Sequence, residues 1–325
     1  MMTATIDKVN PLVGYILDET IKKGATPSYE NFTLFKEKAA LVLKKYAEGI
    51  GVDKFVLGLS GGLDSAYVAL IAKRSLELMG KDSHNLILVT LPCFGTGKRT
   101  FSNAMSLIED LAATHINIDI KELANISLAL LDISKDDRST AFENIQARLR
   151  TALLLTLANK HNALELGTGD FSEIVLGWCT FGGDNVSMYN VNATVPKTFI
   201  RESILSFGQN ENKGYLVDIA TSPISPELLP SNSGEELSQH TEDAVGSYDL
   251  VDTLIYYNMV KGYSIEKSID FAKKVLPQFD KCDILKIGAN YIEHYARVFE
   301  KRKRTQGFKN LSTPYALLTP LKSKE

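Results

Sequence analysis

Residues 54–65 read Lys54-Phe55-Val56-Leu57-Gly58-Leu59-Ser60-Gly61-Gly62-Leu63-Asp64-Ser65. The apolar run at 54–59 predicts a short buried strand, and the spacing of apolar residues from Ala66 to Met79 predicts a helix that begins near Ser65. A glycine-rich turn between a strand and a helix presents backbone N–H groups that can bind an anion. The segment therefore predicts an anion-binding turn in an α/β protein.

Strands and helices continue to alternate along the chain. Further strands are expected at 85–91, 115–120 and 164–167, and further helices at 29–49, 101–113 and 141–161. This alternation predicts a doubly wound parallel sheet with helices on both faces. Such sheets bind ligands at the carboxyl ends of their strands, so the loops after Leu59, Leu91 and Leu166 are the expected places for a site.

The pattern changes after Lys197. The polar run at 208–214 predicts a turn, and the segment 222–234, with its three prolines and no periodicity, predicts a long loop. Helices are expected at 248–260, 264–275 and 283–304. We expect an N-terminal extension over residues 1–28 and a single domain over 29–325, with a helical C-terminal extension at 248–304 packed on it.

Composition narrows the class of protein. The chain has 325 residues, with 36 Lys and Arg against 39 Asp and Glu, so bulk charge argues against nucleic-acid binding. Three separated cysteines argue against a zinc site or redox pair. No secretory signal and no run of 18 apolar residues occurs. We expect a cytoplasmic protein with reduced thiols that binds neither nucleic acid nor membranes.

Asp64 gives the predicted turn a specific chemistry. Ser60, Ser65 and the N–H groups of the turn can donate to phosphate oxygens. A carboxylate beside them would repel a phosphate unless Mg²⁺ bridges the two. The alternative is an ordinary strand-to-helix turn.

The Ser-Gly-Gly-Leu-Asp-Ser turn is the signature of the PP-loop ATP pyrophosphatases, which cleave ATP between the α and β phosphates. Several families share this turn, and other segments of the chain distinguish among them. These segments are Glu143-Asn144-Ile145-Gln146-Ala147-Arg148, Leu166-Gly167-Thr168-Gly169-Asp170-Phe171-Ser172-Glu173, Leu176-Gly177-Trp178-Cys179-Thr180, Asp184, and residues 187–189, 191–198, 222–230 and 241–243. Over about residues 30–310 the chain resembles the NAD synthetase family, and most of all the synthetase half of its glutamine-dependent members.

The resemblance implies an adenine nucleotide alpha hydrolase-like fold and an ATP-dependent ligase. The implied reaction amidates deamido-NAD to NAD through an acyl adenylate and releases AMP and pyrophosphate. It also implies a homodimer. Only about 54 residues precede the first expected strand, too few for the nitrilase-type amidase domain of glutamine-dependent enzymes. We therefore expect ammonia as the nitrogen donor, either free or delivered by a separate glutaminase or amidase partner.

The resemblance also implies roles for individual residues. The implied catalytic residues are Asp64, Glu173 and Lys197, and Asp64 and Glu173 are the implied Mg²⁺ ligands. The implied ATP-binding residues are Gly58, Leu59, Ser60, Gly61, Gly62, Leu63, Asp64, Ser65, Thr168 and Lys197. The implied contacts to deamido-NAD are Asn144, Arg148, Glu173, Trp178, Cys179, Thr180, Phe181, Asp184 and Lys303.

Each implied role has a simpler alternative. Glu173 can be a surface residue in the first turn of a helix, where a carboxylate is favourable. Lys197, expected as a mobile charge on ATP phosphates, can be a solvated lysine. Arg148 can be a helix-face arginine, and Trp178 a core residue. Lys303 lies in a basic run at 301–304, which can simply complement a helix end.

Two other functions remain open. One is a PP-loop enzyme that adenylates another carboxyl group or a tRNA base, although a tRNA-modifying enzyme would require a wider basic surface than this charge balance indicates. The other is a non-catalytic nucleotide-binding subunit.

Overall fold

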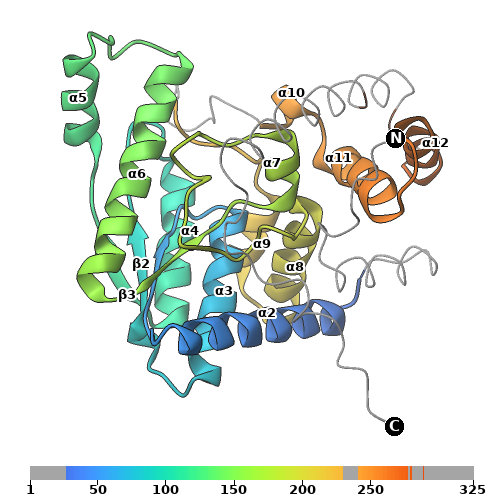
Figure 1. The fold of residues 1–325 in the computed structure, drawn as a ribbon, viewed down its shortest axis with the longest axis horizontal. Coiled ribbons are helices and arrows are strands. Elements are labelled where there is room, and N and C mark those ends of the chain that lie inside the picture. The colour runs from blue at the N-terminus through green and yellow to red at the C-terminus, as the bar shows by residue number, and fades with distance from the viewer. Residues whose placement is uncertain (1–26, 230–240, 277–278, 280–287, 289–325) are drawn as a thin grey trace.

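The computed structural model describes residues 27–229, 241–276, 279 and 288, and a five-stranded parallel sheet forms its centre (Figure 1). The strands are β1 (Phe55–Gly58), β2 (Leu86–Thr90), β3 (Thr114–Asn117), β4 (Leu164–Gly167) and β5 (Tyr189–Asn190). Their order is β3-β2-β1-β4-β5, and every neighbouring pair is parallel. The chain therefore reverses its direction across the sheet between β1 and β4, which is where doubly wound folds bind ligands.

The helices are α2 (Tyr29–Gly49), α3 (Leu63–Leu78), α4 (Lys98–Leu111), α5 (Lys121–Leu130), α6 (Thr140–His161), α7 (Phe171–Leu176), α8 (Lys197–Asn210), α9 (Gly214–Thr221), α10 (Thr241–Val245), α11 (Tyr248–Ile255) and α12 (Ile265–Val275). Ser83–Asn85 forms a turn of 3₁₀ helix, and Tyr256–Val260 continues α11 as a π-helical turn.

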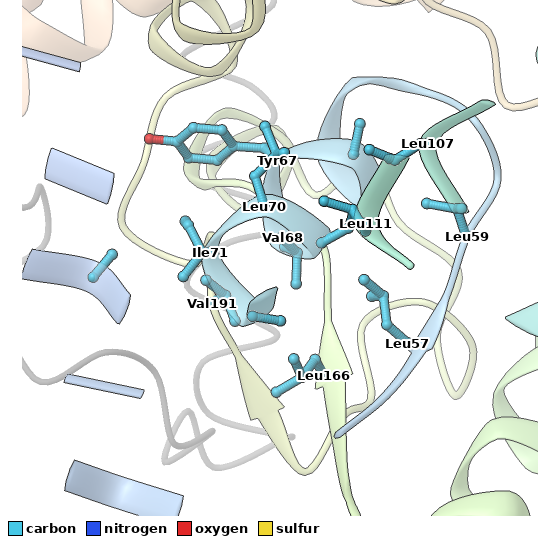
Figure 2. Close-up of a cluster of buried hydrophobic side chains, with 14 of the residues drawn as sticks. Leu57, Leu59, Tyr67, Val68, Leu70, Ile71, Leu107, Leu111, Leu166 and Val191 are labelled. Carbon is cyan, nitrogen blue, oxygen red and sulfur yellow. The ribbon is translucent and has the colours of Figure 1, made fainter. Parts of the chain in front are cut away.

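Alternate residues of the strands face two different helical layers. Leu57, Leu88 and Leu166 pack with α2, α3, α4, α8 and α9. Val56, Ile87 and Val89 pack with α5 and α6 on the opposite face. Figure 1 shows α5 and α6 at one side of the molecule, and Figure 2 shows leucines of β1 and β4 directed toward side chains of α3 and α4. Both faces of β1 are therefore covered, and its carboxyl end is left for the site.

A separate apolar cluster joins the C-terminal helices to α7. Phe171, Val175 and Leu176 of α7 pack with Leu250 and other apolar residues of α11 and α12. The segment that contains Glu173 is therefore packed against a part of the chain more than 70 residues further on.

The expected doubly wound sheet with helices on both faces is confirmed, but some boundaries differ. Helix α3 begins at Leu63, two residues before Ser65, and β3 ends at Asn117 and not at 120. The turn predicted at 208–214 is shorter, because α8 continues through Asn210. Gly208 is needed there for packing, since a Cβ would lie 2.8 Å from Val217 of α9. Apart from Gly288, the helix expected at 283–304 lies outside the described residues, as does most of the 1–28 extension.

Candidate active site

The turn after β1 is held by hydrogen bonds among its own residues. The Oγ atoms of Ser60 and Ser65 lie 3.1 Å apart, Gly62 N donates to Ser60 Oγ at 3.1 Å, and Ser65 Oγ donates to Gly62 O at 3.2 Å. Gly61 has a φ of +84°, and a Cβ there would lie 2.0 Å from the carbonyl oxygen of Thr100 in α4. The turn therefore packs tightly on α4, and its residues lead directly into the N-terminus of α3.

The turn after β4 contributes two carboxylates. Asp170 is the N-cap of α7, and its Oδ1 accepts a hydrogen bond from Glu173 N at 2.8 Å. Asp64 lies in the first turn of α3, which follows the neighbouring strand β1. One carboxylate oxygen each from Asp64, Asp170 and Glu173 lies within 4.8 Å of the other two. The parallel pairing of β1 and β4 thus brings three acidic groups together at one edge of the sheet.

Lys197, the first residue of α8, lies among these carboxylates. Its Nζ is 2.6 Å from Asp64 Oδ2, 2.6 Å from Asp170 Oδ2 and 2.8 Å from Glu173 Oε1. The lysine side chain is 1% exposed. The three residues expected to be catalytic are therefore adjacent. The alternative of a solvated lysine is wrong, because Lys197 is buried among the carboxylates. Its contact with ATP phosphates stays a prediction.

The charges of this cluster do not balance. Three carboxylates and one ammonium leave a formal charge of −2 when all are ionised. Burial raises the pKa of Asp170 well above its ordinary value, and burial with the nearby Asp64 raises the pKa of Glu173 to about 7 despite Lys197. Burial lowers the pKa of Lys197, but the carboxylates outweigh it and hold that pKa well above its ordinary value. The site therefore favours binding of additional positive charge.

The donor atoms fit a magnesium ion. Asp64 Oδ1 is buried and has no hydrogen-bond partner in the part of the chain that the structure describes. Mg²⁺ prefers oxygen ligands and is commonly held by one or two carboxylates together with substrate phosphates. An unpartnered oxygen in a cluster with excess negative charge meets that requirement, and the roles of Asp64 and Glu173 as Mg²⁺ ligands stay predictions.

Asn192 connects the two turns that form the site. It is fully buried between β5 and α8, and its Nδ2 donates to the carbonyl oxygens of Asp64 and Thr168, each at 3.2 Å. Thr168, expected to bind ATP, is therefore beside Asp64.

Residues expected to bind deamido-NAD form a second group, between α6 and the segment after α7. Thr180 Oγ1 donates to Asn144 Oδ1 at 2.8 Å, and Arg148 Nε donates to the Phe181 carbonyl at 3.0 Å. Asp184 Oδ1 accepts from Thr180 N at 2.6 Å. The structure therefore brings these five predicted residues together, and Phe181 is 59% exposed.

Three other predicted contacts have different outcomes. Trp178 is half-buried and packs against the apolar cluster of α7, α11 and α12, and its contact with deamido-NAD stays a prediction. Cys179 is half-buried beside it. Lys303 lies outside the described residues.

Asp170 and Asp252 were not among the site residues predicted from sequence. The sequence could have indicated that Asp170 begins a helix, because an Asp three residues before a Glu is typical of a helix N-terminus. Asp252 of α11 accepts hydrogen bonds from Ser172 and Thr198, which lie 80 and 54 residues away in sequence. No local pattern could have indicated that contact.

Comparison with known proteins gives a consistent result. The family model described as NAD synthase matches residues 35–281. A glutamine-dependent NAD(+) synthetase of Mycobacterium leprae is 36% identical over 282 residues, which cover 80% of this chain and 41% of that protein. An NH(3)-dependent NAD(+) synthetase of Hyperthermus butylicus is 31% identical over 227 residues, which cover 70% of this chain and 75% of the relative.

Solved structures share the fold. A glutamine-dependent NAD(+) synthetase from Cytophaga hutchinsonii has a TM-score of 0.65 at 20% identity, covering 85% of this chain and 50% of that one. An NH3-dependent NAD synthetase from Campylobacter jejuni has a TM-score of 0.58 at 20% identity, covering 82% and 95%. The chain spans about two fifths of the length of the mycobacterial relatives, 41% in each case. Within the described ranges, no helix has the length and apolar character needed to cross a bilayer.

Proposed function

Because the chain belongs to the NAD synthase family, we propose that it is a ligase that amidates deamido-NAD (nicotinic acid adenine dinucleotide) to NAD with ATP and ammonia. The nicotinate carboxylate attacks the α-phosphorus of ATP, which forms an acyl adenylate and releases pyrophosphate. Ammonia then forms the C–N bond of the amide, and AMP leaves. The observation that carries this proposal is the buried cluster of Asp64, Asp170, Glu173 and Lys197 at the β1–β4 switch.

Attack of a carboxylate on a triphosphate brings negative charges together, so the site must supply positive charge. The turn at 58–65 binds the triphosphate with its backbone N–H groups, its serine hydroxyls and the start of α3. Thr168 donates its hydroxyl to ATP. Asp64 and Glu173 hold Mg²⁺, which when bound offsets the charge of the phosphates. Lys197 adds a second positive charge, and its carboxylate neighbours keep it protonated.

The second group of residues binds deamido-NAD. The polar side chains of this group are held in place by the hydrogen bonds described above, and they belong to Asn144, Arg148, Thr180 and Asp184. Phe181 offers an exposed aromatic ring. Glu173 is proposed to contact both substrates, since it belongs to the carboxylate cluster and precedes Thr180 of this group by only seven residues. Trp178, Cys179 and Lys303 complete the proposed set.

The proposed nitrogen donor is ammonia, free or delivered by a separate glutaminase or amidase partner. The relative named as NH(3)-dependent, of which this chain covers 75%, supports this choice. The proposed assembly is a homodimer, and sedimentation equilibrium of the purified chain should give twice the chain mass of 35.9 kDa.

One assay tests the proposal. The purified chain is mixed with ATP, Mg²⁺, ammonium and deamido-NAD, and we expect NAD, AMP and pyrophosphate in equal amounts. ATP cleavage that depends on tRNA, with no NAD, would indicate another PP-loop enzyme. Nucleotide binding without any turnover would indicate a non-catalytic subunit. Glutamine turnover at a rate comparable with ammonium would contradict the proposed nitrogen donor.

A further inference from the structure

We propose that Asp252 of α11 is a positioning residue that fixes Lys197 and Glu173 in the carboxylate cluster. The inference rests on the proposed function, because it assigns a role in the same site. Asp252 Oδ2 accepts hydrogen bonds from Thr198 N at 2.8 Å and from Thr198 Oγ1 at 2.7 Å, and its Oδ1 accepts from Ser172 Oγ. One carboxylate therefore binds the first turns of both α7 and α8.

These contacts are immediately adjacent to the residues of the cluster. Thr198 follows Lys197, and Ser172 precedes Glu173. Ser172 Oγ also accepts a hydrogen bond from Lys197 N at 2.9 Å, so Asp252 reaches the backbone of Lys197 through a single hydroxyl group. The two helix starts are further joined by the hydrogen bond from Phe171 N to Val195 O at 3.0 Å. A change at Asp252 should therefore move both Lys197 and Glu173.

Burial and charge indicate that this carboxylate has a specific role. Asp252 is 7% exposed, and none of the cations in the described ranges pairs with it. Its charge is instead compensated by the hydroxyl and N–H donors and by the positive end of α8. Asp249, one turn earlier on α11, pairs with the guanidinium of Arg201 and is 37% exposed. It joins α11 to α8 without contacting either helix start, which makes it a matched control.

The test compares Asp252→Asn with Asp249→Asn. The substitution at Asp252 would put an amide NH₂ where a carboxylate oxygen now accepts hydrogen bonds, so at least one helix start loses its acceptor. Binding of Mn²⁺ alone, titrated by electron paramagnetic resonance, should weaken by about tenfold or more in Asp252→Asn, and kcat for NAD formation should fall by a similar factor. The KM for deamido-NAD should also rise, because Glu173 is proposed to contact that substrate. Asp249→Asn should match the wild type in all three measurements.

Two further variants cover the case in which Asp252→Asn does not fold. Ser172→Ala and Thr198→Val keep the carboxylate and each remove one hydroxyl donor, and both should weaken Mn²⁺ binding in the same direction. Unchanged Mn²⁺ affinity and kcat in the folded variants would overturn the proposal, as would equal losses in Asp249→Asn or a wild type that binds no Mn²⁺. A wild type that binds Mn²⁺ but makes no NAD would refute the proposed function alone, since the Mn²⁺ comparison would still test Asp252.

Discussion

At the residue scale, the site depends on which carboxylate oxygens the buried Lys197 leaves without a partner. Asp64 Oδ2 binds Lys197, whereas Asp64 Oδ1 is buried without a hydrogen-bond partner among the described residues. Asp64→Asn should therefore raise the activation free energy of NAD formation by several kcal/mol, because a metal ligand is lost. This change lowers kcat on the order of a thousandfold. Circular dichroism should show an unchanged fold.

The control for this variant lies at the other end of the same strand. Asp53 precedes β1 and pairs with Lys81 on the surface, so Asp53→Asn should keep the activity of the wild type. If Asp64→Asn retained near-full activity, Asp64 would have no place in the mechanism.

Lys197 should also be essential for stability. Lys197→Met leaves three carboxylates without their common cation, and breaking a buried ion pair typically costs about 3–5 kcal/mol. Urea unfolding at pH 7.5 in the presence of a chelator should give a free energy of unfolding that is lower than that of the wild type by this amount. The loss should shrink at pH 5, because Glu173, whose pKa is raised to about 7, then takes up a proton. A loss below about 1 kcal/mol, typical of surface pairs, would show that the cluster is solvated.

At the element scale, the turn between β1 and α3 is shaped by its packing on α4. Gly61→Ala should destabilise the protein by about 2–5 kcal/mol, because it combines a positive φ with a Cβ 2.0 Å from Thr100 O. Gly62 is the matched control, since its φ is −91° and a Cβ there would meet only Ser60 Oγ at 3.4 Å. Thermal unfolding that ranks Gly62→Ala as the more damaging change would contradict this packing.

Strand β4 carries a buried acid outside the site. Glu165 is 4% exposed on the face covered by α6, its Oε2 accepts a hydrogen bond from Met188 N, and burial raises its pKa to about 7. A raised pKa in the folded state means that its contribution to stability is present at low pH and lost as the pH rises through 7. The free energy of unfolding of Glu165→Gln, relative to that of the wild type, should therefore rise by about 3 kcal/mol between pH 4 and pH 8.5.

Unfolding free energies across this pH range measure that gain, with Glu122→Gln on the exposed surface of α5 as the control. A difference between wild type and Glu165→Gln that does not change with pH would show that Glu165 is solvated.

The elements predicted from sequence are those that show either a continuous apolar run or a helical repeat over several turns. Strands β1, β2 and β4 are buried on both faces and appear as short apolar runs, and α2 and α6 are long enough to show helical spacing. The six-residue α7 and two-residue β5 are too short to show any period. Both elements lie at the candidate active site, so the sequence pattern predicted secondary structure least well there.

At the scale of the whole molecule, the site is assembled by topology. Asp64 follows β1, Asp170 and Glu173 follow β4, and Lys197 begins α8 after β5. The turn and the family resemblance predicted roles for Asp64, Glu173 and Lys197, and the structure places these three residues together. The turn and the resemblance could not indicate that Lys197 is buried by three carboxylates, or that Asp252 of α11 holds two helix starts, because those contacts depend on how distant segments pack.

Residues 59–65 are proposed to bind the triphosphate of ATP beside a cation held by acidic side chains. The most direct test is a crystal structure of the chain with α,β-methylene ATP and Mg²⁺, since this analogue cannot be cleaved between its α and β phosphates. We predict phosphate density within hydrogen-bond distance of Ser60 and the N–H groups of the turn, with the ion bound by Asp64 and Glu173. A structure with the nucleotide bound elsewhere and this turn empty would contradict the account.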